Sequence, residues 1–210
     1  MIIVFLSNGY LLFELIFIVG IPTVLLSIFP SFLVYRHLIM ILALAYIIFI
    51  ALRLPIRINL TIINFPPFFH IFLQSILPSF LVVILILLIN RFLPSVLVDP
   101  GKIINFKSLP HFAPLILYPL LSVPLQEIIF RWFYVGRFQG SYLGQPLIIL
   151  ISALVFGLVH LPFGKPAIAV GTFFLGLWWS TIYLSSGNLW YSLISHAIIG
   201  NTLIYLALYP

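Results

Sequence analysis

The chain has 210 residues, of which 64% are hydrophobic and 6% are charged, and its mean hydropathy is +1.31. Because about a quarter of the residues in a soluble domain are charged, this composition excludes a soluble globular protein and predicts an integral, multi-pass membrane protein. The formal net charge of +6 comes from scattered Lys and Arg and there is no Cys, so we expect no nucleic acid partner, no disulfide bond and no thiol chemistry.

Seven apolar stretches approach the length of about 20 residues that a helix needs to cross a bilayer. They lie at 9–29, 33–53, 68–90, 112–136, 145–163, 166–185 and 188–208, and prolines fall at most of the joins. The first stretch has no basic residues before it, so we interpret it as a membrane segment rather than a signal peptide. The predicted fold class is all-α, a polytopic transmembrane bundle of about seven helices.

One stretch, 91–110, has the composition of a polar connection, with Arg91, Asp99, Lys102 and Lys107. It divides the chain into residues 1–109, which contain three helices and the connecting loop, and residues 110–210, which contain four helices. Most of the ionisable residues that lie inside apolar stretches belong to the second part, which is therefore predicted to carry the function.

Three acidic residues occur in the whole chain, and Glu127 lies in the middle of a hydrophobic segment. A charged group at membrane depth costs roughly 2.5–3.5 kcal/mol on insertion scales. Arg131 follows four residues later, so the two side chains share a helix face and can pair. The pair either fixes the helix within the bundle or serves a reaction. Glu14, in the first stretch, is expected to snorkel or to pair with a basic residue from another helix.

Two histidines accompany this pair on other helices. His160 closes the fifth stretch, where an interfacial or hydrogen-bonded His is common, whereas His196 lies in mid-helix and needs a partner from another helix. Asn201 follows His196 by five residues, and only a π-bulge or an unwound turn at Gly200 would bring it onto the same face. Without that distortion, Asn201 is expected to be a hydrogen bonder in helix packing.

Together, Glu127, His160 and His196 predict a site on three helices that has two chemical interpretations. Two imidazoles and a carboxylate suit zinc, with a fourth position left for water, and the metal would make hydroxide available at neutral pH. Without a metal, the Glu would act as a general base and a His would stabilise an oxyanion. The sequence leaves both interpretations open.

Three motifs in this order resemble the CAAX protease and bacteriocin-processing family of intramembrane proteases, also called the Abi family. The family pattern is EExxxR on one helix, FxxxH on the next and HxxxN on a later one. Here the first motif runs from Gln126 to Arg131, the second from Phe156 to His160, and the third begins at His196. The resemblance covers about residues 110–208.

The resemblance implies a bundle of seven or eight helices and a peptidase that acts on prenylated or other membrane-associated proteins. In the family, the first Glu and the two His activate the attacking water, the Asn helps to hold the oxyanion, and the second Glu and the Arg support the site. This chain departs twice, because Gln126 replaces the first Glu and Asn201 stands one residue late. An amide cannot act as a base, so either Glu127 takes that role or hydrolysis is lost.

The sequence therefore predicts an intramembrane endopeptidase with Glu127, His160, His196 and Asn201 as catalytic residues and Gln126, Arg131 and Phe156 in support. Its partners are expected to be a peptide or lipidated protein substrate and membrane lipids, and by analogy its location is the plasma (inner) membrane. The alternative is a non-catalytic relative that acts in bacteriocin immunity or partner binding. A transporter is disfavoured because the two halves show no internal repeat.

Overall fold

A computed structural model of the protein describes residues 8–29, 31, 35–53, 64–97, 112–139, 143–163 and 165–209. All regular structure within these ranges is helical, which confirms the predicted all-α class. The polar connection predicted at 91–110 lies for the most part outside the described residues, and so do Asp99, Lys102 and Lys107.

The described helices fall into the seven predicted segments, and most of their ends agree within a few residues. The first segment is α1 (Asn8–Leu15), η1 (Ile16–Gly20) and α2 (Ile21–Ile28); the second is α3 (Arg36–Arg53); the third is α4 (Phe68–Ile71), η4 (Phe72–Ile76) and α5 (Leu77–Phe92), followed by the short α6 (Pro94–Leu97). The fourth is α8 (Ala113–Leu117), η5 (Tyr118–Ser122), α9 (Val123–Glu127), η6 (Ile128–Val135) and α10 (Gly136–Phe138). The last three are α11 (Gln145–Leu158) with the 3-10 turn η7 (Leu161–Phe163), α12 (Pro166–Ser186) and α13 (Trp190–Leu208).

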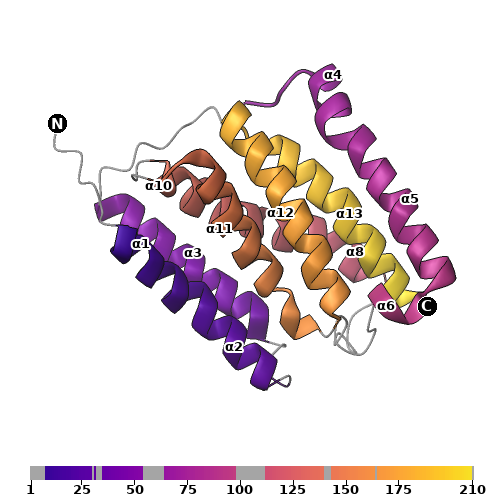
Figure 1. Cartoon of the computed structure of the whole chain (residues 1–210), viewed down its shortest axis with the longest axis horizontal. Coiled ribbons are helices and arrows are strands. Elements are labelled where there is room, and N and C mark those ends of the chain that lie inside the picture. Colours follow the sequence, from indigo (N-terminus) through magenta and orange to yellow (C-terminus); the bar gives the residue numbers. More distant parts are fainter. Residues whose placement is uncertain are drawn as a thin grey trace.

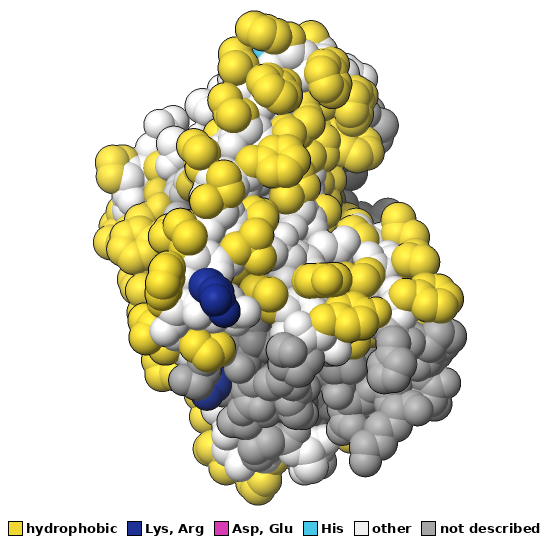
Figure 2. Space-filling model, turned by 90° about the vertical axis from the view of Figure 1, so that its right-hand side faces the viewer, with side chains coloured by type: hydrophobic (Ala, Val, Ile, Leu, Met, Phe, Trp, Pro, Cys, Tyr) yellow, Lys and Arg dark blue, Asp and Glu magenta, His cyan; other side chains and the backbone are white. Residues whose placement is uncertain are grey.

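Length and hydropathy support a membrane-embedded bundle. Within the described residues, five segments are long and apolar enough to span a membrane: Phe68–Phe92, Ala113–Phe138, Gln145–Phe163, Pro166–Ser186 and Trp190–Leu208. The two N-terminal segments contain shorter apolar helices, Leu12–Ile28 and Leu38–Ile50. Figure 2 shows many hydrophobic side chains on the described part of the face on the α4–α5 side. Such a surface is suited to lipid rather than to water.

The helices are arranged so that α13 lies inside the bundle. The N-terminal hairpin, α1–α2 with α3, lies along one edge and α5 lies along the opposite edge beside α13 (Figure 1). Helices α11 and α12 pack closely against each other, and α13 contacts α12, α5 and the fourth segment. The third segment and α12 therefore enclose the helix that carries His196.

Three π-helical turns have a common local cause in proline. Pro22, Pro78 and Pro124 each stand two residues after the last residue of a π-turn, η1, η4 and η5 respectively. A proline ring lacks the N–H and clashes with the carbonyl four residues before it. Hydrogen bonds from i to i+5 widen the preceding turn and so relieve this clash without breaking the helix.

Serine hydroxyls fix α13 between its neighbours. Ser195 Oγ accepts hydrogen bonds from Ser79 Oγ and from Trp179 Nε1, both at 2.9 Å, and Ser75 Oγ donates to the carbonyl of Tyr191 at 2.8 Å. Small and hydroxylated residues are the usual means of tight helix packing in membranes. These bonds connect α12, α13 and the third segment one residue away from His196.

The N-terminal hairpin is attached to the rest of the bundle by a buried charge pair. Glu14 is 4% exposed, accepts a hydrogen bond from the Tyr46 hydroxyl, and forms an ion pair with Arg137 of α10. One of the two expectations for Glu14, pairing with a basic residue from another helix, is therefore confirmed. The contacts of α3 with α9 and η6 extend the same interface.

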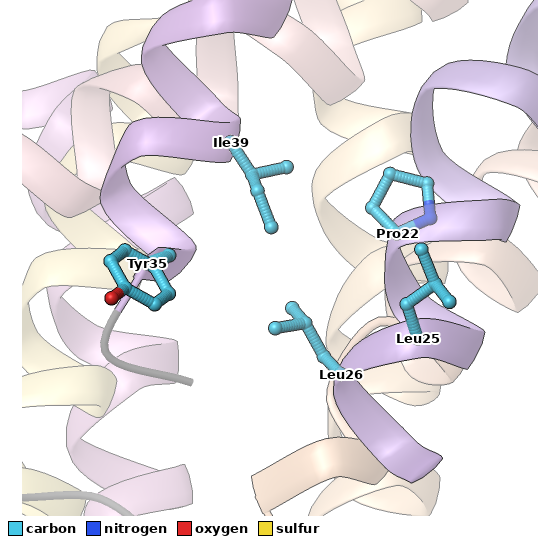
Figure 3. Close-up of a pocket in the computed structure, with 5 residues that line it drawn as sticks. All are labelled: Pro22, Leu25, Leu26, Tyr35 and Ile39. Atoms are coloured by element: carbon cyan, nitrogen blue, oxygen red, sulfur yellow. The ribbon is translucent and has the colours of Figure 1, made fainter. Parts of the chain in front are cut away.

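A pocket of 290 Å³ opens between α2 and the start of α3. Pro22, Leu25 and Leu26 line it from α2, and Tyr35 and Ile39 face them from the other side (Figure 3). The lining residues that the structure describes are four aliphatic residues and one tyrosine, so this part of the pocket offers a mainly hydrocarbon environment.

Candidate active site

The candidate site is built on an irregular stretch of the fourth segment. Glu127 is the last residue of α9, and the eight-residue π-helical stretch η6 follows directly and contains Arg131. Unlike the other three π-turns, η6 is not followed by a proline. Both side chains have 0% exposure. π-Helical turns are frequently found at functional sites, and this one sets the position of the guanidinium relative to the carboxylate.

Glu127 is bonded to His196 of α13. Their atoms Oε1 and Nδ1 are 2.8 Å apart, and His196 is 3% exposed. A carboxylate only accepts hydrogen bonds, so the imidazole donates its Nδ1–H and its Nε2 carries the lone pair. The partner that His196 was predicted to need is therefore Glu127, which lies on another helix and 69 positions away in the chain.

Tyr118 occupies the other ring nitrogen of His196. Its hydroxyl oxygen is 2.9 Å from Nε2, and the two rings meet edge to face with centroids 6.0 Å apart. With the lone pair on Nε2, Tyr118 is the donor. The result is a chain of hydrogen bonds from Glu127 through His196 to Tyr118, which orients the imidazole and directs its basic nitrogen at a hydroxyl.

Arg131 forms an ion pair with Glu127 without a hydrogen bond. Its Nε lies 3.5 Å from Glu127 Oε2, and none of the three guanidinium nitrogens has a hydrogen-bond partner in the described part of the chain. The guanidinium carbon lies 4.3 Å above the Phe156 ring and 5.5 Å from the Trp179 ring. Because the guanidinium is fully buried, this cation–π contact partly compensates the missing hydrogen bonds.

Two aromatic rings enclose His196. Trp179 stacks on it with centroids 4.5 Å apart and an interplanar angle of 24°, and Phe156 meets it edge to face at 5.7 Å. Trp179 is held in turn by its bond to Ser195. The imidazole therefore has its plane fixed by packing and its rotation fixed by hydrogen bonds at both nitrogens.

His160 is placed near this group but is bonded elsewhere. It stands in the turn after α11, where its Nδ1 donates to the carbonyl oxygen of Phe156 at 2.6 Å. Its ring is 4.7 Å from the Phe156 ring, which thus contacts both imidazoles. The structure brings Glu127, Arg131, His196 and Phe156 together and leaves His160 in contact with them through Phe156.

Asn201 and Gln126 occupy positions outside the hydrogen-bonded chain. The amide of Asn201 donates to the carbonyl of Leu115 at 3.1 Å, which is a packing contact between α13 and α8. A π-bulge or unwound turn at Gly200, one of the two alternatives for Asn201, is absent because α13 is a regular α-helix from Trp190 to Leu208. Gln126 is half-buried beside Glu127. Of the two adjacent motif residues, the one that faces His196 is therefore Glu127.

The geometry also tests the predicted zinc ligands. Among the described residues, no group of three or more His, Cys, Asp or Glu side chains gathers as a metal site. Both ring nitrogens of His196 are hydrogen-bonded, and Glu127 Oε1 is bonded to one of them. Zinc needs free imidazole and carboxylate lone pairs directed at one point. The three residues do not fit that requirement in this arrangement, so we assign no metal to the mechanism of this protein.

Sequence reasoning missed two residues of this group, Tyr118 and Trp179. Neither residue was selected from the sequence as part of the site. The sequence carries a signal for Tyr118 in Gly200, which leaves no side chain on the His196 face one turn further along α13. Some other element must then fill that space, although the sequence does not show which one.

Fold and site together define a polytopic α-helical membrane protein with a fully buried carboxylate–imidazole pair. Residues 108–201 match the family model described as Type II CAAX prenyl endopeptidase Rce1-like. This match confirms the resemblance to CAAX proteases over the part of the chain that carries the three motifs. No curated protein and no solved structure matches the chain.

Proposed function

We propose that this protein is an intramembrane endopeptidase of the CAAX protease type, which uses an activated water to hydrolyse a peptide bond of a membrane-associated or lipidated protein. The observation that carries the proposal is the bond between Glu127 and His196 at 2.8 Å. It turns the basic nitrogen of a buried imidazole away from the carboxylate and toward the hydroxyl of Tyr118. A carboxylate that orients a His in this way is the arrangement of hydrolases that use a His base.

In this mechanism His196 is the general base. Its Nε2 takes a proton from water while the water oxygen attacks the carbonyl carbon, and the carbonyl π electrons move onto the oxygen. Glu127 stabilises the imidazolium that forms. The tetrahedral intermediate then collapses, the C–N bond breaks, and the Nε2–H proton passes to the leaving amine. Glu127 thus orients the base rather than acting as the base itself.

The supporting residues balance the charge of Glu127 and pack around the two imidazoles. Arg131 balances the charge of Glu127 at 3.5 Å, so that the carboxylate remains an acceptor for His196. Phe156 contacts Arg131 and both imidazoles and keeps water from them. His160 donates to a backbone carbonyl through Nδ1, which directs the lone pair of its Nε2 elsewhere, and we assign it to binding the substrate or the attacking water.

The substrate is proposed to be a peptide presented from the membrane. The lipid-facing surface and the apolar pocket between α2 and α3 suit a lipid-modified or membrane-embedded partner. Because α2 also packs against η7, the turn that follows His160, that pocket belongs to the same region of the bundle as the motif. By analogy with compact bacterial membrane proteins, we propose the plasma membrane as its location.

A second candidate function is that of a non-catalytic relative, an immunity or assembly protein. One observation favours it: Glu127, Arg131 and His196 are at most 3% exposed, and a neutral Gln126 takes the place of the first motif Glu. In that case the buried group would only stabilise the fold. Hydrolysis at so buried a group requires the bundle to open, and a non-catalytic relative would never open in this way.

The deciding experiment uses purified wild-type protein and the His196→Gln variant in detergent, with a quenched library of peptides that carry and lack a prenylated Cys. The peptidase proposal expects cleavage by wild type, loss of cleavage in His196→Gln, and unchanged activity after treatment with EDTA. Bound zinc is quantified in the same samples. Cleavage that is abolished by EDTA and restored by zinc would contradict the metal-free mechanism. A folded wild type that cleaves nothing would support the binding protein instead.

A further inference from the structure

Position 200 of α13 has an unusual environment. Gly200 stands four residues after His196, so in this regular α-helix both positions lie on one face. A Cβ atom built on Gly200 would overlap Cε1 and the hydroxyl oxygen of Tyr118, and would lie 2.7 Å from its Cζ. The outer edge of the Tyr118 ring therefore fills the room that a side chain at position 200 would need.

Tyr118 comes from a different helix and is firmly placed there. It is the first residue of η5, directly before Pro119, and its ring reaches across to α13. Its hydroxyl is bonded to Nε2 of His196 at 2.9 Å. A larger residue at position 200 would push the ring away, so Gly200 and Tyr118 form a matched pair. Together they place the Tyr118 hydroxyl on the His196 face of α13, at a position where α13 itself has no side chain.

Asn201 does not provide this polar group. Its amide nitrogen is held by the carbonyl of Leu115, at 3.1 Å. Among the described residues, the polar group at Nε2 of His196 is the phenol of Tyr118, which has a single O–H donor.

We propose that the Tyr118 hydroxyl is the group that stabilises the oxyanion during hydrolysis, in place of a side chain on α13. This inference rests on the peptidase function proposed above. A tyrosine O–H in an apolar site can serve as an oxyanion donor, as it does in ketosteroid isomerase. Here the donor stands beside the base, which is where the carbonyl oxygen of an attacked peptide must lie.

The hydroxyl changes its acceptor during the reaction. In the resting protein it donates to His196 Nε2. When a peptide and a water enter, the O–H donates to the peptide carbonyl oxygen, and the freed Nε2 accepts the water proton. The carbonyl π electrons move onto the oxygen that Tyr118 holds, and they return when the C–N bond breaks. Tyr118 keeps its own proton throughout, so the step balances with water as the second reactant.

Tyr118→Phe is the direct test, because it removes the hydroxyl and keeps the ring against Gly200. Loss of one oxyanion donor lowers kcat by about 10²- to 10³-fold, and we expect KM to stay within about threefold because the donor acts mainly on the transition state. Tyr134→Phe is the matched control. Tyr134 is also a buried tyrosine of the fourth segment, and its hydroxyl has no hydrogen-bond partner in the described residues. The kcat of Tyr134→Phe should equal that of wild type.

A rescue experiment separates this role from packing. Tyr118→Ala removes both donor and ring, and we expect it to lose as much activity as Tyr118→Phe or more. The double variant Tyr118→Ala/Gly200→Asn puts an amide donor into the vacated room on the His196 face. We expect it to recover at least about tenfold in kcat over Tyr118→Ala, whereas Gly200→Asn alone collides with the Tyr118 ring and loses activity.

The outcomes are distinct. Wild-type hydrolysis with an unchanged kcat in Tyr118→Phe would overturn the inference and leave the peptidase function standing. A double variant that folds but recovers nothing over Tyr118→Ala would also overturn it, because a donor on that face would then be irrelevant. If wild type hydrolyses no peptide, both the function and the inference fail. Thermal unfolding in detergent is measured for each variant, so that loss of fold is distinguished from loss of rate.

Discussion

Two buried glutamates pair with arginines in this protein, and they differ in what surrounds them. Glu14 pairs with Arg137 across two helices, and its second carboxylate oxygen accepts from Tyr46. Glu127 pairs with Arg131 within one helical segment at 3.5 Å, without a hydrogen bond, and its other oxygen is bonded to His196. Both carboxylates are almost inaccessible to water.

The difference separates a charge that attaches helices from a charge that orients a base. The two oxygens of Glu14 are bonded to Tyr46 of α3 and Arg137 of α10, so these contacts join the N-terminal hairpin to α10. The interactions of Glu127 continue through His196 to Tyr118. Burial and ion pairing alone therefore do not indicate catalysis, and the proposed function rests on the connected imidazole with its basic nitrogen.

The largest expected effect comes from breaking this connection at the candidate site. Glu127→Gln keeps the size of the side chain and an oxygen that can accept from His196 Nδ1, but it removes the charge that stabilises the imidazolium. In serine proteases the equivalent change lowers kcat about 10⁴-fold, so we expect a decrease of about 10³- to 10⁴-fold. Turnover of a quenched peptide by the purified variant measures it.

The same change at the other glutamate is the control. Glu14→Gln should leave turnover per folded molecule within about threefold of wild type, because Glu14 has no hydrogen bond to the candidate site. Equal losses in the two variants would contradict the distinction between the pairs.

Most residues of the two charge pairs could be selected from the sequence, for physical reasons. An ionisable residue inside an apolar stretch is visible without a structure because its burial is costly, which is why Glu14, Glu127, Arg131 and His196 could all be selected. Helical segments could be placed from hydropathy and prolines, and the structure confirms them. The partner of Glu14 could not be named, because Arg137 is 123 positions away.

Other features of the site could not be predicted from local patterns. The three short motifs fix which residues share a helix face, but not how η6 and η5 rotate Glu127 and Tyr118 toward α13. Tyr118 has no charge, and tyrosine is ordinary in a membrane helix, so nothing in its own neighbourhood distinguishes it. The catalytic role predicted for Asn201 stays a prediction, and its observed bond to Leu115 is of the packing kind.

A second, smaller effect concerns stability at the N-terminal pair. Removing one partner of a buried ion pair leaves an uncompensated charge and destabilises a protein by about 3–5 kcal/mol. We expect Glu14→Gln to lower the free energy of unfolding by such an amount, because Arg137 is 6% exposed and cannot reach water. Unfolding in mixed micelles with increasing SDS measures the change.

The double variant Glu14→Leu/Arg137→Met sharpens this prediction. Replacing a whole buried pair with apolar residues is often neutral or stabilising, so the double variant should recover most of the lost stability. If it is as unstable as Glu14→Gln, then the pair has a role beyond its own charge balance.

The smallest expected effect disturbs the candidate site through packing alone, with no change of charge. Gly157 follows Phe156, and a Cβ there would lie 2.9 Å from the Ala169 carbonyl oxygen and 3.0 Å from Phe173 Cβ. Gly157→Ala should therefore separate α11 from α12 and destabilise by about 1–3 kcal/mol, the usual range for overpacking. It should also lower turnover, because Phe156 contacts Arg131 and both imidazoles.

Gly171→Ala on α12 is the matched control, since a Cβ there has nothing within 4 Å and Gly in a helix is about 0.5–1 kcal/mol less favourable than Ala. It should be slightly more stable than wild type and equally active. Because the N-terminal pair lies outside the α11–α12 contact, Gly157→Ala should not change the effect of Glu14→Gln, and their unfolding free energies should add. Strong coupling between them would mean that the two buried glutamates belong to one network, and the distinction between an attaching charge and an orienting charge would have to be abandoned.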